Sequence, residues 1–230
     1  MNKRGIPWSF DHEVRGHPPE RMVESTEVDS DLELLDAWRD GDRAAGAELF
    51  ARHFAAVYGF FRNKLEDAAE DLTQQTFLRC VESRDAFRGT SSFRGYMFVI
   101  ARNLLFEQLR RRGARRVEPD FDVDSLEDLV ASPSTIMRVH EDHQLLVQSL
   151  RRLPLSLQVA LELYFVQRMR GDEIATALDI PPGTVRSRIR RALEQLREIT
   201  AELSSSPSSL RATTTDLQRW AAVVREGPPR

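Results

Sequence analysis

The chain has 230 residues, of which 41% are hydrophobic and 30% charged, a balance typical of soluble globular domains rather than of disordered or membrane proteins. A chain of this length holds one domain or two small ones. Its longest near-continuous apolar stretch, Phe54 to Phe61, is much shorter than the about 20 residues of a transmembrane helix. Residues 1–20 lack the apolar stretch of a signal peptide. We therefore expect a cytoplasmic protein. The chain has a single cysteine, Cys80, which excludes an internal disulfide framework.

Charge is sorted into blocks along the chain. The net charge of -3 by itself argues against a nucleic-acid binder. However, residues 84–116 hold nine arginines against two acids, whereas residues 118–128 hold six acids. All but two of the 33 basic residues are arginine, whose planar guanidinium suits phosphate and guanine. The codon bias of a GC-rich genome explains the arginine excess equally well, but it does not explain the blocks.

Helical periodicity recurs throughout, and no long stretch alternates with a period of two. In the first half we expect four helices around one core. The pattern from Ser30 to Glu33 is that of a capping box, which would begin the first helix. Gly41 would end that helix, and Asp42 would cap the second. The third is expected from about residue 68 to 82 and the fourth from about 93 to 112.

Composition divides the chain into five segments. Residues 1–28 are rich in proline and charge, and we expect them to be disordered. Residues 29–116 are predicted to form one helical domain and residues 139–203 a second. Between them lies an acidic, flexible linker at 117–138, and residues 204–230 form a tail with a weak helical pattern. The predicted fold is therefore all-α, with two small helical domains.

The segment from Gly171 to Arg197 is the most informative in the chain. A short helix, the turn Asp179-Ile180-Pro181 and a longer helix have the spacing of a helix-turn-helix. The apolar residues of the longer helix share one face, which must be buried: Val185, Ile189, Ala192, Leu193 and Leu196. The opposite face holds arginines that would repel one another without an opposing anion, which favours a DNA-binding helix over an ordinary solvated basic face. The candidate DNA-binding residues are Thr184, Arg186, Ser187, Arg188, Arg190 and Arg191.

Residues 150–197 resemble region 4, the promoter-reading C-terminal domain of bacterial RNA polymerase sigma factors. The resemblance is carried by LP at 153–154, EIA at 173–175 and GTVRSRIRRA at 183–192. LuxR-type response regulators share part of this pattern. By itself, this segment therefore leaves open a regulator that binds duplex operators.

The first half of the chain decides between the two classes. AEDLTQQTFLRCVE at 69–82 and FRGTSSFRGYMFVIARNLLFEQLRRR at 87–112 resemble region 2 of the extracytoplasmic-function (ECF) sigma factors, the compact members that contain only regions 2 and 4. The two motifs occur in the right order. On this resemblance the chain is identified as an ECF sigma factor of the sigma-70 family. A regulator that binds operators remains the alternative, and it would leave the basic fourth helix unexplained.

The resemblance implies roles for three sets of residues. The third helix would bind the clamp coiled coil of the largest polymerase subunit, through Asp71, Gln74, Gln75 and Leu78. The loop at 88–92 and the fourth helix would capture the non-template strand of the minus-ten element with one base flipped out, through Arg88, Ser91, Ser92, Phe93, Tyr96, Arg102, Asn103 and Arg110. Region 4 would read the minus-thirty-five element and contact the polymerase flap. A solvated face for the third helix, and core packing for Phe93 and Tyr96, remain open from the residues alone.

The resemblance also implies partners. They are core RNA polymerase, promoter DNA and an anti-sigma factor, with no small-molecule substrate, no cofactor and no catalytic residue. Some positions depart from the family pattern. Tyr96 replaces the usual tryptophan, and Arg170 stands where a serine normally caps a helix with Glu173. Milder departures are Glu107, Gln158 and Arg168. Loss of that half of the capping box typically costs about 1 kcal/mol.

Enzyme classes find little support in the residues. His140 and His143 could lie near one helix face, but two ligands are too few for a zinc site. Cys80 lies within a predicted helix and is better explained by packing than as a nucleophile. We therefore expect no metal site and no enzymatic activity.

Overall fold

The computed structural model describes residues 21–62, 64–87, 92–112, 144–203 and 217–218, and every regular element within them is helical. The first group of helices is α2 (Arg21–Arg39), α3 (Arg43–Arg62), η1 (Glu66–Ala68), α4 (Ala69–Glu82), η2 (Arg84–Ala86) and α5 (Phe93–Arg111). The second group is α7 (Gln144–Arg152), α8 (Leu155–Leu161), η5 (Glu162–Val166), α9 (Gly171–Leu178) and α10 (Pro182–Leu203). The all-α prediction is confirmed. None of the described helices is both long and apolar enough to cross a membrane.

The turn between α2 and α3 has the predicted chemistry. Gly41 adopts a φ of +106°, a left-handed conformation that glycine reaches without strain. Asp42 then caps α3, because its Oδ1 accepts a hydrogen bond from the backbone N–H of Ala44 at 2.8 Å. Gly41 thus ends one helix and Asp42 begins the next.

The beginning of α2 was predicted wrongly. The helix starts at Arg21 and not at Ser30, so it includes part of the segment for which an irregular extension was expected. Ser30 therefore lies inside the helix, and its hydroxyl accepts a hydrogen bond from Arg52 at 3.1 Å instead of capping α2. The physical reason is local: residues 21–29 contain no glycine or proline that would break the helix.

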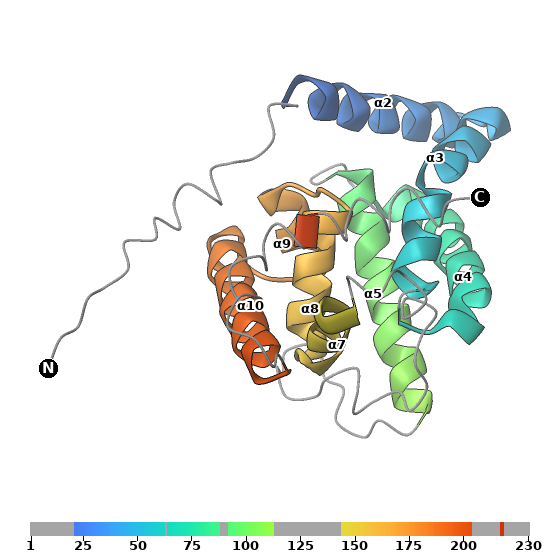
Figure 1. Ribbon diagram of the computed structural model, residues 1–230. Coiled ribbons are helices and arrows are strands. Elements are labelled where there is room, and N and C mark those ends of the chain that lie inside the picture. Colours follow the sequence, from blue (N-terminus) through green and yellow to red (C-terminus); the bar gives the residue numbers. More distant parts are fainter. Residues whose placement is uncertain (1–20, 63, 88–91, 113–143, 204–216, 219–230) are drawn as a thin grey trace, which may run out of the picture.

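Helix α5 lies at the centre of the molecule. Figure 1 shows it between α4 on one side and α8 and α9 on the other. Its apolar residues are buried along almost its whole length, from Phe93 to Leu109, and they belong to one continuous hydrophobic cluster that extends through both groups of helices. The two groups therefore pack against each other through α5.

The second group contains the predicted helix-turn-helix. Helix α9 ends at Leu178, and the residue after it, Asp179, has a left-handed φ of +54°. Helix α10 begins after the turn. All five residues predicted for the buried face of α10 are buried. The helix continues to Leu203, beyond the predicted end of the motif at Arg197. Pro154 precedes α8 and separates it from α7, as predicted.

Several predicted features lie outside the described residues. They are the acidic linker at 117–138, most of the loop at 88–92, the pair His140 and His143, and nearly all of the tail. Within the tail the structure describes Leu217, whose side chain is completely buried.

Candidate functional site

The four candidate residues of α4 lie together on one exposed face. Asp71 and Gln74 are exposed, and Gln75 is half-buried. The Gln75 side-chain amide donates a hydrogen bond to the Asp71 carboxylate at 2.7 Å, which orients both groups. Leu78, two helical turns after Asp71, has 57% of its surface exposed. The face therefore combines polar groups with an apolar side chain, as expected of a surface that binds a protein.

An apolar extension of this face was not predicted from the sequence. Phe54 and Val81 are 50% and 44% exposed, and with Leu78 they are the large hydrophobic residues that the described part of the chain exposes most. The Phe54 ring stacks on Phe77 of α4, with the ring centroids 6.2 Å apart. The aromatic-rich sequence of α3 could have indicated an exposed ring, because one helix face cannot bury so many aromatic side chains.

The exposed part of α5 carries two of the candidate strand-binding residues. Asn103 and Arg110 are both exposed and, seven residues apart, they share one helix face. Arg110 Nε donates a hydrogen bond to the backbone oxygen of Phe106 at 3.3 Å, which leaves the side chain lying along the helix surface. Arg88 and Ser91 lie outside the described residues.

The two candidate aromatic residues of α5 are held by their neighbours. Tyr96 is half-buried, and its hydroxyl donates a hydrogen bond to the Ser83 hydroxyl at 2.6 Å. Phe93 is only 2% exposed, and its ring lies edge-on to Phe87 with centroids 6.2 Å apart. In this arrangement the Phe93 ring is part of the core, whereas Tyr96 is partly exposed.

Ser92 and Arg102, the remaining candidates in this set, face the second group of helices. The Ser92 hydroxyl accepts a hydrogen bond from the Gly95 N–H at 3.0 Å, which caps α5, and donates one to the Glu173 carboxylate of α9 at 2.6 Å. Arg102 is 6% exposed and donates a hydrogen bond to the backbone oxygen of Ala177 at 3.1 Å. Both side chains are therefore covered by α9.

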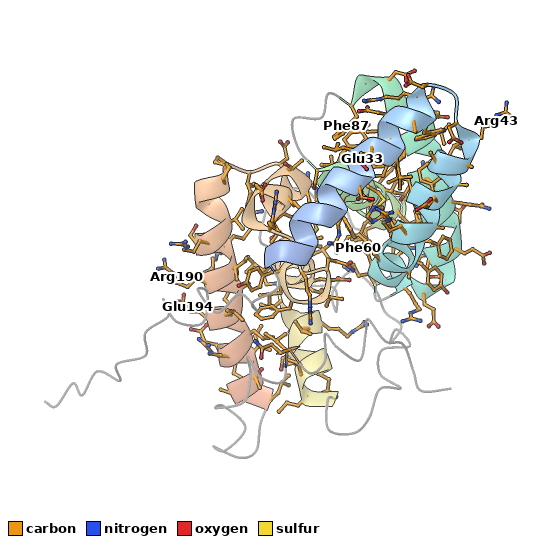
Figure 2. The ribbon with its side chains drawn as sticks, turned by 90° about the horizontal axis from the view of Figure 1, so that it is seen from above. Glu33, Arg43, Phe60, Phe87, Arg190 and Glu194 are labelled. Atoms are coloured by element: carbon orange, nitrogen blue, oxygen red, sulfur yellow. The ribbon has the colours of Figure 1, made fainter. Side chains whose placement is uncertain are left out.

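The candidate residues of α10 form the basic face opposite its buried stripe. Arg186, Ser187, Arg190 and Arg191 are exposed, and Thr184 and Arg188 are half-buried. Figure 2 shows Arg190 and Glu194 on the outer side of the helix, away from the rest of the chain, where they form an ion pair of 3.8 Å. Such an exposed pair contributes little to stability, so Glu194 holds the Arg190 side chain only weakly.

The departure at Arg170 has a structural consequence. One half of the capping box is present, because Glu173 Oε2 accepts a hydrogen bond from the Arg170 N–H at 2.9 Å. The other half is missing, as predicted, since the arginine side chain has no acceptor atom. The second Glu173 oxygen binds Ser92, so this carboxylate joins the N-termini of α5 and α9.

Cys80 has none of the properties of a catalytic nucleophile. Its side chain is buried, and this burial raises the pKa of the thiol to about 12, so the reactive thiolate is absent at neutral pH. Among the described residues, no group of three or more His, Cys, Asp or Glu side chains is arranged to hold a metal ion.

Comparisons with known proteins agree with these features. The family model "Sigma-70 region 2" matches residues 49–115, and "Sigma-70, region 4" matches residues 143–196. The ECF RNA polymerase sigma-E factor of Salmonella typhimurium is 29% identical in an alignment over 178 residues that covers 73% of this chain and 92% of the relative. The RNA polymerase sigma-H factor of Pseudomonas aeruginosa has the same identity and coverage.

One solved structure shows a similar fold. CnrH, in complex with the cytosolic domain of CnrY, matches with a TM-score of 0.55 at 23% identity, over 76% of this chain and 99% of that chain. The chain belongs to the sigma-70 family, and within it to the ECF sigma factors. It binds core RNA polymerase and directs transcription initiation to promoters, and it is not an enzyme.

Proposed function

We propose that this sigma factor uses three separate surfaces in promoter recognition. The exposed face of α4 docks on the clamp of the polymerase, through Asp71, Gln74, Gln75 and Leu78. The loop at 88–92 and α5 hold the non-template strand of the minus-ten element. The basic face of α10 enters the major groove of the minus-thirty-five element. The observation that carries the proposal is that α4 and α10 present these residues to solvent while their apolar stripes are buried.

The residue types fit the proposed ligands. On α10, Ser187 and Arg190 are exposed near the helix N-terminus, the part of a recognition helix that contacts base edges. Neighbouring arginines such as Arg186 can contact phosphates, which position the helix without reading sequence. On α5, Asn103 and Arg110 offer donors to a single strand, and Tyr96 offers part of a ring for stacking.

The domain boundaries and cellular context belong to the same proposal. Residues 29–116 act as region 2 and residues 139–203 as region 4, with 117–138 as the linker, 1–28 as an extension and 204–230 as a tail. The protein works in the cytoplasm, where the polymerase is. An anti-sigma factor controls it. The likeness of the fold to that of CnrH, which was solved with the cytosolic domain of CnrY, supports a protein partner for this fold.

Run-off transcription tests the assignment of the first two surfaces. Core polymerase is incubated with the protein on fragments of its own genome, and promoter-specific transcripts are compared between variants. Asp71→Ala should weaken the binding of core polymerase, measured separately by co-elution. Asn103→Ala should leave that binding intact but reduce the transcripts, because the strand is held less well in the open complex.

Glu33→Ala, a change of an exposed carboxylate on α2, is the matched control and should behave like the unaltered protein. Transcript yields that are the same for all variants would contradict the assignment of Asp71 and Asn103.

A further inference from the structure

Two arginines join the C-terminal end of α2 to the segment that follows α4. Arg39, the last residue of α2, donates hydrogen bonds to the Arg84 backbone oxygen at 2.9 Å and to the Phe87 backbone oxygen. In return, Arg84 Nη1 donates a hydrogen bond to the Trp38 backbone oxygen at 3.3 Å, and the Arg84 guanidinium lies 5.1 Å from the centre of the Trp38 ring. Each arginine thus binds the backbone of the segment that carries the other.

The guanidinium of Arg39 holds two points of this segment at once. Its Nε and Nη2 both point at the Arg84 oxygen, at 3.3 and 2.9 Å, and Nη2 also donates to the Phe87 oxygen. Only 26% of the Arg39 side chain is exposed. A planar fork of donors fixes direction as well as distance, which the single ammonium of a lysine does not do. Arg39 therefore fixes the backbone on both sides of η2.

Phe87 and Ser83 connect this segment to Tyr96 of α5. The Phe87 ring is buried, and its centre lies 5.0 Å from that of Tyr96. The Tyr96 hydroxyl donates its hydrogen bond to Ser83, the residue before Arg84. Figure 2 shows Phe87 beside α2, where Arg39 reaches its backbone. Residues 83–87 thus contact both the ring and the hydroxyl of Tyr96, and Arg39 holds residues 84–87.

The orientation of Tyr96 matters for its candidate role. A partly exposed ring can stack on a base of a single strand, but the stacking is strong only when neighbouring groups fix the ring beforehand. Without Phe87 behind it, the Tyr96 ring would be free to turn about its side-chain bonds. The series of contacts runs from α2 through residues 84–87 to this ring.

We propose that Arg39 is a positioning residue for the minus-ten strand: by holding residues 84–87 it keeps Tyr96 in the orientation that stacks on a base. Arg39 acts through Phe87 and does not touch the strand itself. This inference rests on the proposed assignment of Tyr96 to the strand.

Arg39→Lys is the variant that tests this role. It keeps the positive charge and removes the fork of donors, so a change in binding cannot come from weaker attraction to phosphates. Arg43→Lys on α3 is the matched control, because Arg43 is exposed and Figure 2 shows it pointing away from the rest of the chain. Tyr96→Leu removes the aromatic face but keeps an apolar side chain against Phe87.

Fluorine NMR of the full chain reports the orientation of Tyr96 directly. The chain has three tyrosines, Tyr58, Tyr96 and Tyr164, so labelling with 3-fluorotyrosine gives three resonances, and Tyr96→Leu identifies that of Tyr96. Arg39→Lys should shift or broaden the Tyr96 resonance and leave the other two in place. A general loss of stability would affect all three, and Arg43→Lys should affect none.

Strand affinity is measured on the holoenzyme formed with core polymerase. The probe is a fluorescent single-stranded DNA with the non-template minus-ten sequence of a promoter that run-off transcription identifies. Loss of one stacked base in Tyr96→Leu should weaken binding about tenfold, and Arg39→Lys should weaken it about fivefold. In the Tyr96→Leu background Arg39→Lys should cost nothing more, because residues that act through one contact are not additive. Binding of core polymerase should be the same in all variants.

Three results would overturn the proposal. The first is an unchanged Tyr96 resonance in Arg39→Lys. The second is a loss of strand affinity that adds fully to that of Tyr96→Leu, because Arg39 would then act independently of the ring. The third is an equal loss in Arg43→Lys, which would make the effect unspecific.

The proposal and the assignment on which it rests can fail separately. If Tyr96→Leu weakens strand binding but Arg39→Lys does not, Arg39 has no positioning role and the assignment of Tyr96 stands. If Tyr96→Leu binds the strand as tightly as the unaltered protein, the assignment of Tyr96 is wrong, and the inference about Arg39 is wrong with it.

Discussion

Lys64 is unusual in a chain in which almost all basic residues are arginine. Its side chain is fully buried, lies 3.9 Å from the centre of the Phe60 ring and donates a hydrogen bond to the Phe60 backbone oxygen at 3.0 Å. Burial lowers the pKa of Lys64, and the Glu162 carboxylate opposes that shift. The compact ammonium of lysine fits a site in which one carboxylate and one ring surround the charge.

Replacing either Lys64 or Glu162 alone should destabilise the protein strongly, because the other charge is then left buried without its partner. Glu162→Gln leaves the ammonium buried opposite a neutral amide, and we expect a loss of about 3 kcal/mol in the free energy of unfolding. Lys64→Met leaves the carboxylate buried and should cost a similar amount. The double variant should cost about 1–3 kcal/mol less than the sum of the two, because no unpaired charge remains.

Urea unfolding of the four proteins provides this double-mutant cycle. Strictly additive losses would show that Lys64 and Glu162 do not stabilise each other. The Asp36→Asn variant, an exposed carboxylate on α2 that pairs with Arg39, is a control and should change stability little.

At the scale of elements, the neighbouring helices α3 and α4 combine two roles. Their inner faces supply core residues such as Leu49, Phe60 and Leu72, while the outer side exposes Phe54, Leu78 and Val81. Exposed apolar side chains that gather on one face are typical of an interaction site. Because the Phe54 ring stacks on Phe77, the residue before Leu78 on α4, we propose that Phe54 extends the polymerase-binding face from α4 onto α3.

Phe54→Ser should therefore weaken the binding of core polymerase without unfolding the protein. Burying a phenylalanine on association is worth about 1–2 kcal/mol when half of its surface is already covered, which corresponds to a loss of about tenfold in affinity. Binding is measured by fluorescence titration of labelled protein with core polymerase, and folding by circular dichroism. Equal affinities of Phe54→Ser and the unaltered protein would remove Phe54 from the interface.

At the scale of the whole molecule, the packing extends beyond the two groups of helices. Leu217, in the tail, is fully buried and belongs to the same hydrophobic cluster as the helices. The sequence predicted only a weak helical pattern there. A part of the tail is thus an integral component of the folded protein.

Truncation after Leu203 should lower the melting temperature, because it exposes the apolar surface that Leu217 covers. Burial of one leucine is worth about 2 kcal/mol, which corresponds to a shift of about 4–8 °C for a chain of this size. Truncation after Gln218 keeps Leu217 and is the control, for which we expect no change. A melting temperature that is the same after both truncations would contradict a stabilising role of the tail.

The local features of the fold could be predicted from the sequence. Helix period, Gly41 and Asp42 at the first turn, and the apolar stripe of α10 were all predictable, because they depend on residues a few positions apart. The family was recognisable for the same reason, since its motifs are short and occur in order. The start of α2 was predicted wrongly. A capping pattern does not stop a helix from extending further toward the N-terminus when no glycine or proline precedes the pattern.

The accessibility of individual side chains, in contrast, depends on the tertiary packing. Phe54 has the spacing of a core residue but lies half-exposed, and Ser92 and Arg102 have the chemistry of strand-binding residues but are covered by α9. Glu173 pairs with a serine far away in the sequence instead of one at its own helix cap. Burial depends on which helix faces meet, and no pattern of neighbouring residues specifies the face that a distant helix will cover.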